Sequence, residues 1–132
     1  MNKRVIIARL RAFLEKRAEI IFAYIHGSFA EGLAWRDIDV AVYVSKDVVP
    51  EDEAIDYGLR ISAISEMETG IRPLDIKVIN YATIGFRYYA TKGILLFSKN
   101  EDIRYDFIED TWKRYFDLLP KRKQILLDLV SP

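Results

Sequence analysis

The fold is decided within residues 20–44, which read IIFAYIHGSFAEGLAWRDIDVAVYV. The short apolar run at 20–25 stops just before Gly27, and this pattern predicts a strand buried on both faces rather than a helix. From residue 37 the side chains alternate, so Asp37 and Asp39 would share one face of a second strand and aliphatic side chains the other. The stretch therefore predicts a strand, a glycine turn with a short helix, and a second strand.

Helices are predicted on both sides of this stretch. Residues 3–18 carry apolar side chains at helical spacing, and another helix begins at the acidic residues after Pro50 and ends before Gly70. Its predicted core stripe consists of Ala54, Tyr57, Ile61, Ile64 and Met67. Later segments predict a helix at about 82–92, a short apolar stretch at 94–97, a helix at about 101–118 that Pro120 ends, and a final short helix at 121–130.

A third alternating strand is predicted at residues 74–79. It places Asp75 and Lys77 on one face and the aliphatic side chains on the other. Strands and helices therefore alternate along 132 residues, a length that suits one domain. We expect an α/β (α+β) fold over residues 1–132, with a small mixed central sheet flanked by helices.

Composition narrows the range of functions. Twenty basic and twenty acidic residues cancel, so no global field draws the chain to nucleic acid, and a local cluster at residues 121–123 is more typical of solvated surface. The absence of cysteine excludes disulfides and thiolate chemistry. No apolar run approaches the ~20 residues of a membrane span. We expect a cytoplasmic protein with no membrane partner and no nucleic-acid partner.

The Gly27-Ser28 pair and the three aspartates carry the chemistry. Glycine backbones at helix starts bind phosphate, and carboxylates bind magnesium. Each feature also has a simpler interpretation when it is considered alone. Gly27-Ser28 would be a turn with a helix cap, Asp37-x-Asp39 a solvated strand end, and Asp75 a surface residue that Lys77 could neutralise. Carboxylates that share one face repel unless a cation lies between them, which favours a metal site.

Other motifs favour simpler interpretations. The glycine spacing at residues 27–32 matches a P-loop, but Leu33-Ala34 stands where that motif requires lysine and serine or threonine. The single histidine, His26, ends an apolar strand and is more typical of a packed structural residue than of a catalyst. Trp35 could stack on a nucleotide base, although packing on the domain is the commoner role of a loop aromatic residue.

Gly27-Ser28, Gly32 and Asp37-Ile38-Asp39 resemble the signature of DNA polymerase β-like nucleotidyltransferases, with Asp75 in the place of the third carboxylate. Residues 93–120 also resemble the C-terminal part of the minimal nucleotidyltransferases of prokaryotes. The resemblance implies transfer of AMP from ATP to a hydroxyl acceptor. Asp37, Asp39 and Asp75 would be the catalytic residues and the ligands of two Mg²⁺ ions, and Gly27 and Ser28 would bind the nucleotide.

The resemblance also implies a partner. Such minimal enzymes are often encoded beside a HEPN-domain ribonuclease toxin, whose tyrosine accepts AMP and is thereby silenced, so the chain would be an antitoxin. Members commonly have ten residues between the serine and the first aspartate, and many carry arginine where Glu31 stands; here eight residues separate Ser28 from Asp37. An inactive antitoxin that acts by binding is therefore the alternative, and a homo-oligomer stays open.

Overall fold

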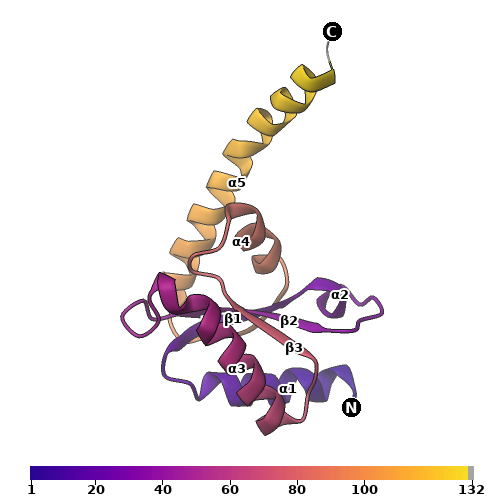
Figure 1. Ribbon diagram of the computed structural model, residues 1–132, viewed down its shortest axis with the longest axis vertical. Helices are drawn as coiled ribbons and strands as arrows, with labels where there is room; N and C mark the ends of the chain where they lie inside the picture. Colours follow the sequence, from indigo (N-terminus) through magenta and orange to yellow (C-terminus); the bar gives the residue numbers. More distant parts are fainter. Residues whose placement is uncertain (131–132) are drawn as a thin grey trace.

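A four-stranded mixed sheet forms the centre of the computed structural model, which describes residues 1–130 (Figure 1). The strands are β1 (Ile20–His26), β2 (Ile38–Val44), β3 (Leu74–Val78) and β4 (Ile94–Ser98). Their order across the sheet is β3-β2-β1-β4; β1 runs antiparallel to β2 and β4, whereas β2 and β3 are parallel. The predicted fold class is confirmed, and the apolar stretch at 94–97 is the fourth strand.

Helices cover both faces of this sheet. They are α1 (Lys3–Glu15), α2 (Gly27–Ala30), α3 (Ala54–Thr69), α4 (Ile84–Thr91) and α5 (Glu101–Val130), with a 3₁₀ turn η1 (Glu51–Glu53) before α3. In Figure 1, α1 and α3 lie below the sheet, whereas α4 and the base of α5 lie above it. Each face has its own apolar cluster: one joins the sheet to α1 and α3, and the other joins it to α4 and α5.

The alternation in β2 gives its two faces different roles. Ile38, Val40 and Val42 are buried in the cluster below the sheet, together with side chains of α1 and α3. Asp39 and Ala41 face the opposite way, toward α4 and α5. The strand begins at Ile38, so Asp37 lies just before it rather than in it. The apolar face therefore fixes the register that places Asp39.

The core stripe predicted for α3 was partly wrong. Tyr57 and Ile61 are buried, but Ile64 is partly exposed and the side chain of Met67 is 78% exposed. The reason is the closeness of α3 to β3: a Cβ atom added to Gly58 would lie 2.8 Å from the carbonyl oxygen of Ile76. Small side chains on α3, at Gly58 and Ser65, therefore face the sheet, and the larger apolar side chains of Ile64 and Met67 lie outside the core.

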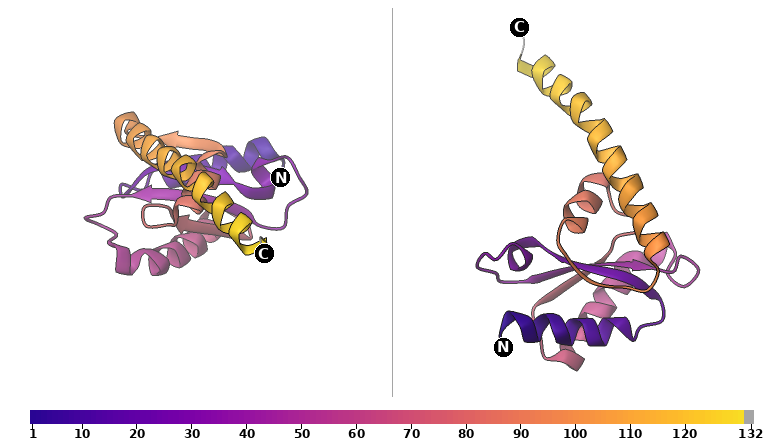
Figure 2. Two further views of the ribbon diagram at one scale, coloured as in Figure 1. Left: turned by 90° about the horizontal axis from the view of Figure 1, so that it is seen from above. Right: turned by 180° about the vertical axis from the view of Figure 1, so that it is seen from behind.

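The prediction that Pro120 ends a helix was also wrong. α5 continues through Pro120 to Val130 and projects from the body of the domain (Figure 2). Proline removes one backbone donor and so leaves the carbonyl four residues earlier without its helical partner. The residues around Pro120 are exposed, so water can reach that carbonyl. No helix among residues 1–130 has an apolar stretch long enough to cross a membrane.

Gly58 in α3 and Gly85 in α4 allow a matched stability test of the α3–β3 contact. We expect Gly58→Ala to lower the free energy of unfolding by about 1–3 kcal/mol, because the backbone of β3 must shift to admit the methyl group. Gly85→Ala in α4 is the control, since its added Cβ would meet only ordinary contact at 3.9 Å and alanine favours a helix. Urea unfolding of both variants measures the difference. Equal stability would contradict this account of the contact.

Candidate active site

Asp39 and Asp75 are direct neighbours across the parallel pairing of β2 and β3. Neighbouring strands lie ~4.8 Å apart, so the two carboxylates lie side by side on one face of the sheet. Burial raises the pKa of the Asp39 carboxyl, and the negative charges of Asp75 and Asp37 raise it further, while Lys77 opposes them. The arrangement therefore concentrates negative charge that a bound cation would neutralise.

Gly27 lies directly against this carboxylate pair. It follows His26, which pairs with Asp39 across β1 and β2. Its φ is +77°, and a Cβ atom there would lie 2.5 Å from Oδ2 of Asp39. Both the left-handed backbone and the lack of space require glycine. The backbone of the turn after β1 is thus brought against a carboxylate, as a site for phosphate beside a metal requires.

The turn after Gly27 is held by one buried aromatic residue. Phe29 is fully buried, and its ring meets the ring of Trp35 edge to face at a centroid distance of 4.8 Å. The backbone N–H of Leu33 donates to the carbonyl oxygen of Ser28 at 3.0 Å. These contacts hold the single turn of α2 and leave Ser28 exposed. The packing interpretation of Trp35 is confirmed.

Asp37, the remaining aspartate of the set, lies in the loop just before β2. Asp37 is exposed, yet it lies near enough to raise the pKa of Asp39. Lys77 Nζ lies 3.5 Å from Oδ2 of Asp75, so the neutralising contact considered for this pair is present. Within residues 1–130, no three histidine, cysteine or acidic side chains are already arranged to hold a metal ion. The assignment of Asp37, Asp39 and Asp75 as metal ligands therefore stays a prediction.

These residues nevertheless suit magnesium in their chemistry. Mg²⁺ takes hard oxygen donors, commonly one or two carboxylates together with substrate phosphates and water. Asp39 and Asp75 supply two such carboxylates, with the charge of Asp37 close by. Burial is the largest cause of the raised pKa of Asp39, and the neighbouring carboxylates add to it, an effect that a bound cation would oppose. The residues present fit the ion that the sequence predicts.

His26 is packed beside Asp39, between the sheet and α4. Its side chain is 7% exposed and meets the rings of Phe86 and Tyr89 edge to face at 5.3 and 6.1 Å. Burial, and next the charge of Lys77, lowers the pKa of His26 to about 4, although Asp75 acts in the opposite direction. The imidazole is therefore neutral at pH 7, and its buried Nδ1 has no hydrogen-bond partner within residues 1–130. The packed interpretation is confirmed.

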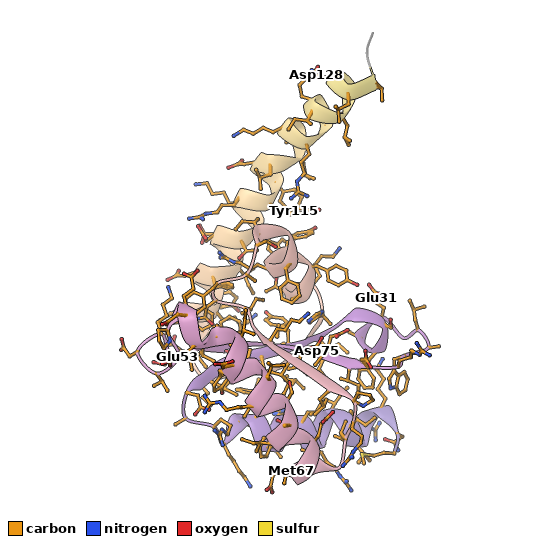
Figure 3. The ribbon with its side chains drawn as sticks, in the orientation of Figure 1. Glu31, Glu53, Met67, Asp75, Tyr115 and Asp128 are labelled. Carbon is orange, nitrogen blue, oxygen red and sulfur yellow. The ribbon has the colours of Figure 1, made fainter. Side chains whose placement is uncertain are left out.

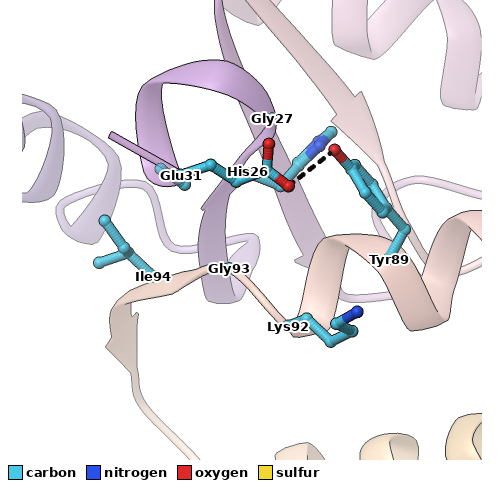
Figure 4. Close-up of a pocket in the computed structure, with 8 residues that line it drawn as sticks. His26, Gly27, Glu31, Tyr89, Lys92, Gly93 and Ile94 are labelled. Atoms are coloured by element: carbon cyan, nitrogen blue, oxygen red, sulfur yellow. Dashed lines mark hydrogen bonds between the residues drawn. The ribbon is translucent and has the colours of Figure 1, made fainter. Parts of the chain in front are cut away.

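A cavity of about 270 Å³ opens beside Gly27 (Figure 4). Glu31 lines one side, and Tyr89 and Lys92 line the other. The hydroxyl of Tyr89 donates to Oε1 of Glu31 at 3.3 Å across this space. Tyr89 and Lys92 were not predicted from the sequence, because they lie some sixty residues along the chain, on α4 and just after it, and only the packing of α4 brings them here.

The single histidine gives a direct test of the environment of the site. We expect the proton resonances of His26 in metal-free buffer to titrate with a midpoint at about 4. Because the folded pKa lies below the unfolded value of about 6.5, neutral His26 favours the folded state above that value. The contribution of neutral His26 to the free energy of unfolding is lost as the pH falls from about 6.5 through 4. A midpoint near 6.5 would show instead that water reaches the ring.

Comparison with solved structures finds the same architecture. A chain from the crystal structure of a toxin–antitoxin with AMP-PNP matches with a TM-score of 0.65 at 20% identity, covering 99% of this chain and 100% of that chain. A chain from a toxin–antitoxin MntA-HepT structure matches with a TM-score of 0.66 at 16% identity, covering 98% and 97%. At these identities the likeness shows the fold.

A third structure contains tri-AMPylated Shewanella oneidensis HEPN toxin in complex with MNT antitoxin; it matches with a TM-score of 0.61 at 18% identity, covering 98% of this chain and 96% of that chain. No curated protein matches in sequence. The family model described as polymerase beta, nucleotidyltransferase matches residues 8–102, which contain Gly27 and all three aspartates. This chain therefore belongs to the polymerase beta nucleotidyltransferase family.

Proposed function

We propose that this chain uses ATP and Mg²⁺ to transfer AMP to a hydroxyl on a protein, a tyrosine of a HEPN ribonuclease toxin, and so acts as the antitoxin of the pair. The observation that carries the proposal is the contact of the Gly27 backbone with Asp39, which is itself paired in register with Asp75. A phosphate approaching Gly27 would thus meet two carboxylates of the kind that bind magnesium.

The Gly27 side of the site is proposed to bind the triphosphate. Without a side chain at Gly27, phosphate oxygens can approach the backbone, and the exposed Ser28 offers a hydroxyl and an amide as donors. The cavity beside Gly27 has room for part of the nucleotide, and Lys92 is among the residues that line it. These groups would orient the α-phosphorus toward Asp75.

Asp37, Asp39 and Asp75 would hold the magnesium ions. Magnesium bound there would offset the charge of the triphosphate and lower the pKa of the acceptor hydroxyl. Burial, and after it the charges of Asp75 and Asp37, raise the pKa of Asp39, and a cation bound there would offset those charges. Lys77, which contacts Asp75, already supplies part of the positive charge that the site needs.

The transfer itself requires one bond to form and one to break. The acceptor oxygen forms a bond to the α-phosphorus, and the bond from the α-phosphorus to the bridging oxygen breaks. Pyrophosphate leaves with that electron pair, and the hydroxyl proton passes to the Asp75 carboxylate and then to water. Asp75 is the proposed acceptor of the proton because it lies on the edge strand, farther from Gly27 than Asp39.

The toxin as acceptor is supported by two observations. The matched structures include toxin–antitoxin complexes, one of which contains an AMPylated toxin. This chain matches over nearly its whole length, and its helices cover the sheet apart from the projecting end of α5 (Figure 2), so no second domain among residues 1–130 encloses a small-molecule acceptor. A partner that brings its own hydroxyl to the open site fits this arrangement.

An inactive antitoxin is the second candidate. The observation that favours it is the carboxylate of Glu31, which lines the cavity beside Gly27 and would repel a triphosphate. In that case the chain would neutralise its partner by binding alone. Calorimetry separates the two: magnesium-dependent binding of ATP supports the transferase, whereas no binding supports the inactive antitoxin.

We expect Asp39→Asn to lower the rate of AMP transfer to a co-expressed HEPN toxin by roughly a hundredfold or more, which corresponds to about 2.7 kcal/mol in activation free energy. The amide keeps the shape of the side chain but removes the charge beside Asp75. Mass spectrometry of the toxin tyrosines measures the transfer. Asp47→Asn is the matched control, because Asp47 is an exposed carboxylate beyond the other end of β2. Equal labelling by wild type and Asp39→Asn would contradict the mechanism.

A further inference from the structure

A second cavity, of about 390 Å³, lies along the outer edge of β3. Its walls include Ile55 and Leu59 of α3, Val78 of β3 and Tyr81. Asp75 and Lys77 also line it, so the groove reaches the candidate active site from the side opposite Gly27. The carboxylate pair is therefore flanked by two cavities, one beside Gly27 and this one, which we call the β3 groove.

The walls of the β3 groove expose apolar side chains to solvent. Ile55 is 80% exposed and Leu59 is 68% exposed, and the two lie one helical turn apart on α3. Gly58 lets the helix approach β3 between them. Large apolar side chains that line a concave surface next to polar groups are typical of a binding site. The groove is thus suited to an apolar or aromatic group.

The edge of β3 restricts what can enter. The N–H of Leu74 donates to Oε2 of Glu66 at 2.8 Å, and the N–H of Ile76 donates to Oγ of Ser62 at 2.9 Å. Side chains of α3 therefore already occupy the outward donors over the first half of this strand. A partner strand cannot pair along the whole edge, which leaves the end near Val78 for a single side chain and its immediate neighbours.

The charge around the groove selects the kind of partner. Glu51 lines it, Asp52 and Glu53 follow in η1, and Asp56 lies in the first turn of α3. Figure 3 shows Glu53 at this start of the helix. Lys77 is the one basic side chain among the described residues that line the groove, and it is already in contact with Asp75. This acidic rim repels the phosphates of a nucleic acid and attracts a basic peptide segment.

We infer that the β3 groove holds the acceptor: a phenol side chain on a protein segment with basic neighbours, its ring between Ile55, Leu59 and Tyr81 and its hydroxyl toward Asp75. This inference rests on the proposed function and deepens it. The nucleotide would enter beside Gly27 and the acceptor from the β3 edge, so the two reactants approach the carboxylate pair from opposite sides. The apolar walls discriminate a tyrosine from a sugar hydroxyl.

The test uses the full chain and a six-residue peptide that contains one tyrosine between lysines. In ¹⁵N NMR titrations we expect saturable shifts at the amides of Gly58, Val78 and Tyr81. Leu59→Gln should weaken binding at least tenfold, because it removes an apolar wall. Met67→Gln is the matched control, since Met67 is also largely exposed, at 78%, but lies at the far end of α3 (Figure 3), and it should bind as wild type does.

Three results would overturn the inference: shifts confined to other parts of the chain, unchanged affinity of Leu59→Gln, or displacement of the peptide by an oligoadenylate. The last would assign the groove to RNA instead. Failure of the proposed function looks different. Peptide binding in the groove by a protein that does not bind ATP contradicts the transferase but not the groove, whereas AMP transfer that is unaffected by Leu59→Gln contradicts the groove alone.

Discussion

The repulsion between two carboxylates held side by side on β2 and β3 is the constraint on which the site depends. Asp39 and Asp75 are locked in register by the pairing of their strands, and burial, followed by the charge of Asp75, raises the pKa of the Asp39 carboxyl. A slip of one residue in either strand would turn the aspartate of that strand into the apolar core below the sheet. The packing of the aliphatic side chains of β2 and β3 therefore holds the two carboxylates together against their mutual repulsion.

One face of the sheet carries most of the apolar core, and the other face carries the candidate active site. Below it, α1 and α3 bury the alternating aliphatic residues in a continuous cluster. Above it, α4 and α5 cover only part of the face, and the aspartates lie where this cover ends. Neutral, buried His26 links the two roles, because it packs against α4 and pairs with Asp39 across β1 and β2. Cavities then remain on either side of the pair.

The alternation of apolar and polar residues was enough to predict β2 and β3. Alternation in residues 37–44 and 74–79 gave the strands and placed Asp39 and Asp75, and the stop at Gly27 gave the turn. Periodicity could not tell which side of α3 faces the sheet, since that depends on how closely Gly58 approaches β3. Nor could it show that exposure allows α5 to continue through Pro120.

The surroundings of the site were not predictable from local sequence. Tyr89 and Lys92 reach the cavity only through the packing of α4, and Ile55 and Leu59 line the β3 groove because that side of α3 faces away from the core. The role of the three aspartates as metal ligands stays a prediction from their spacing and their resemblance to the family. Asp37, on its loop, is the member whose place a bound ion would most directly fix.

Paramagnetic relaxation by Mn²⁺, which takes the same oxygen ligands as Mg²⁺, tests the central claim most directly. Substoichiometric Mn²⁺ should first broaden the amide signals of Gly27, Asp39 and Asp75, and Asp39→Asn should abolish that effect. Broadening that begins instead at the acidic turn Glu51–Glu53, with the signals of Asp39 and Asp75 unchanged, would contradict the assignment of the carboxylate pair as the metal site.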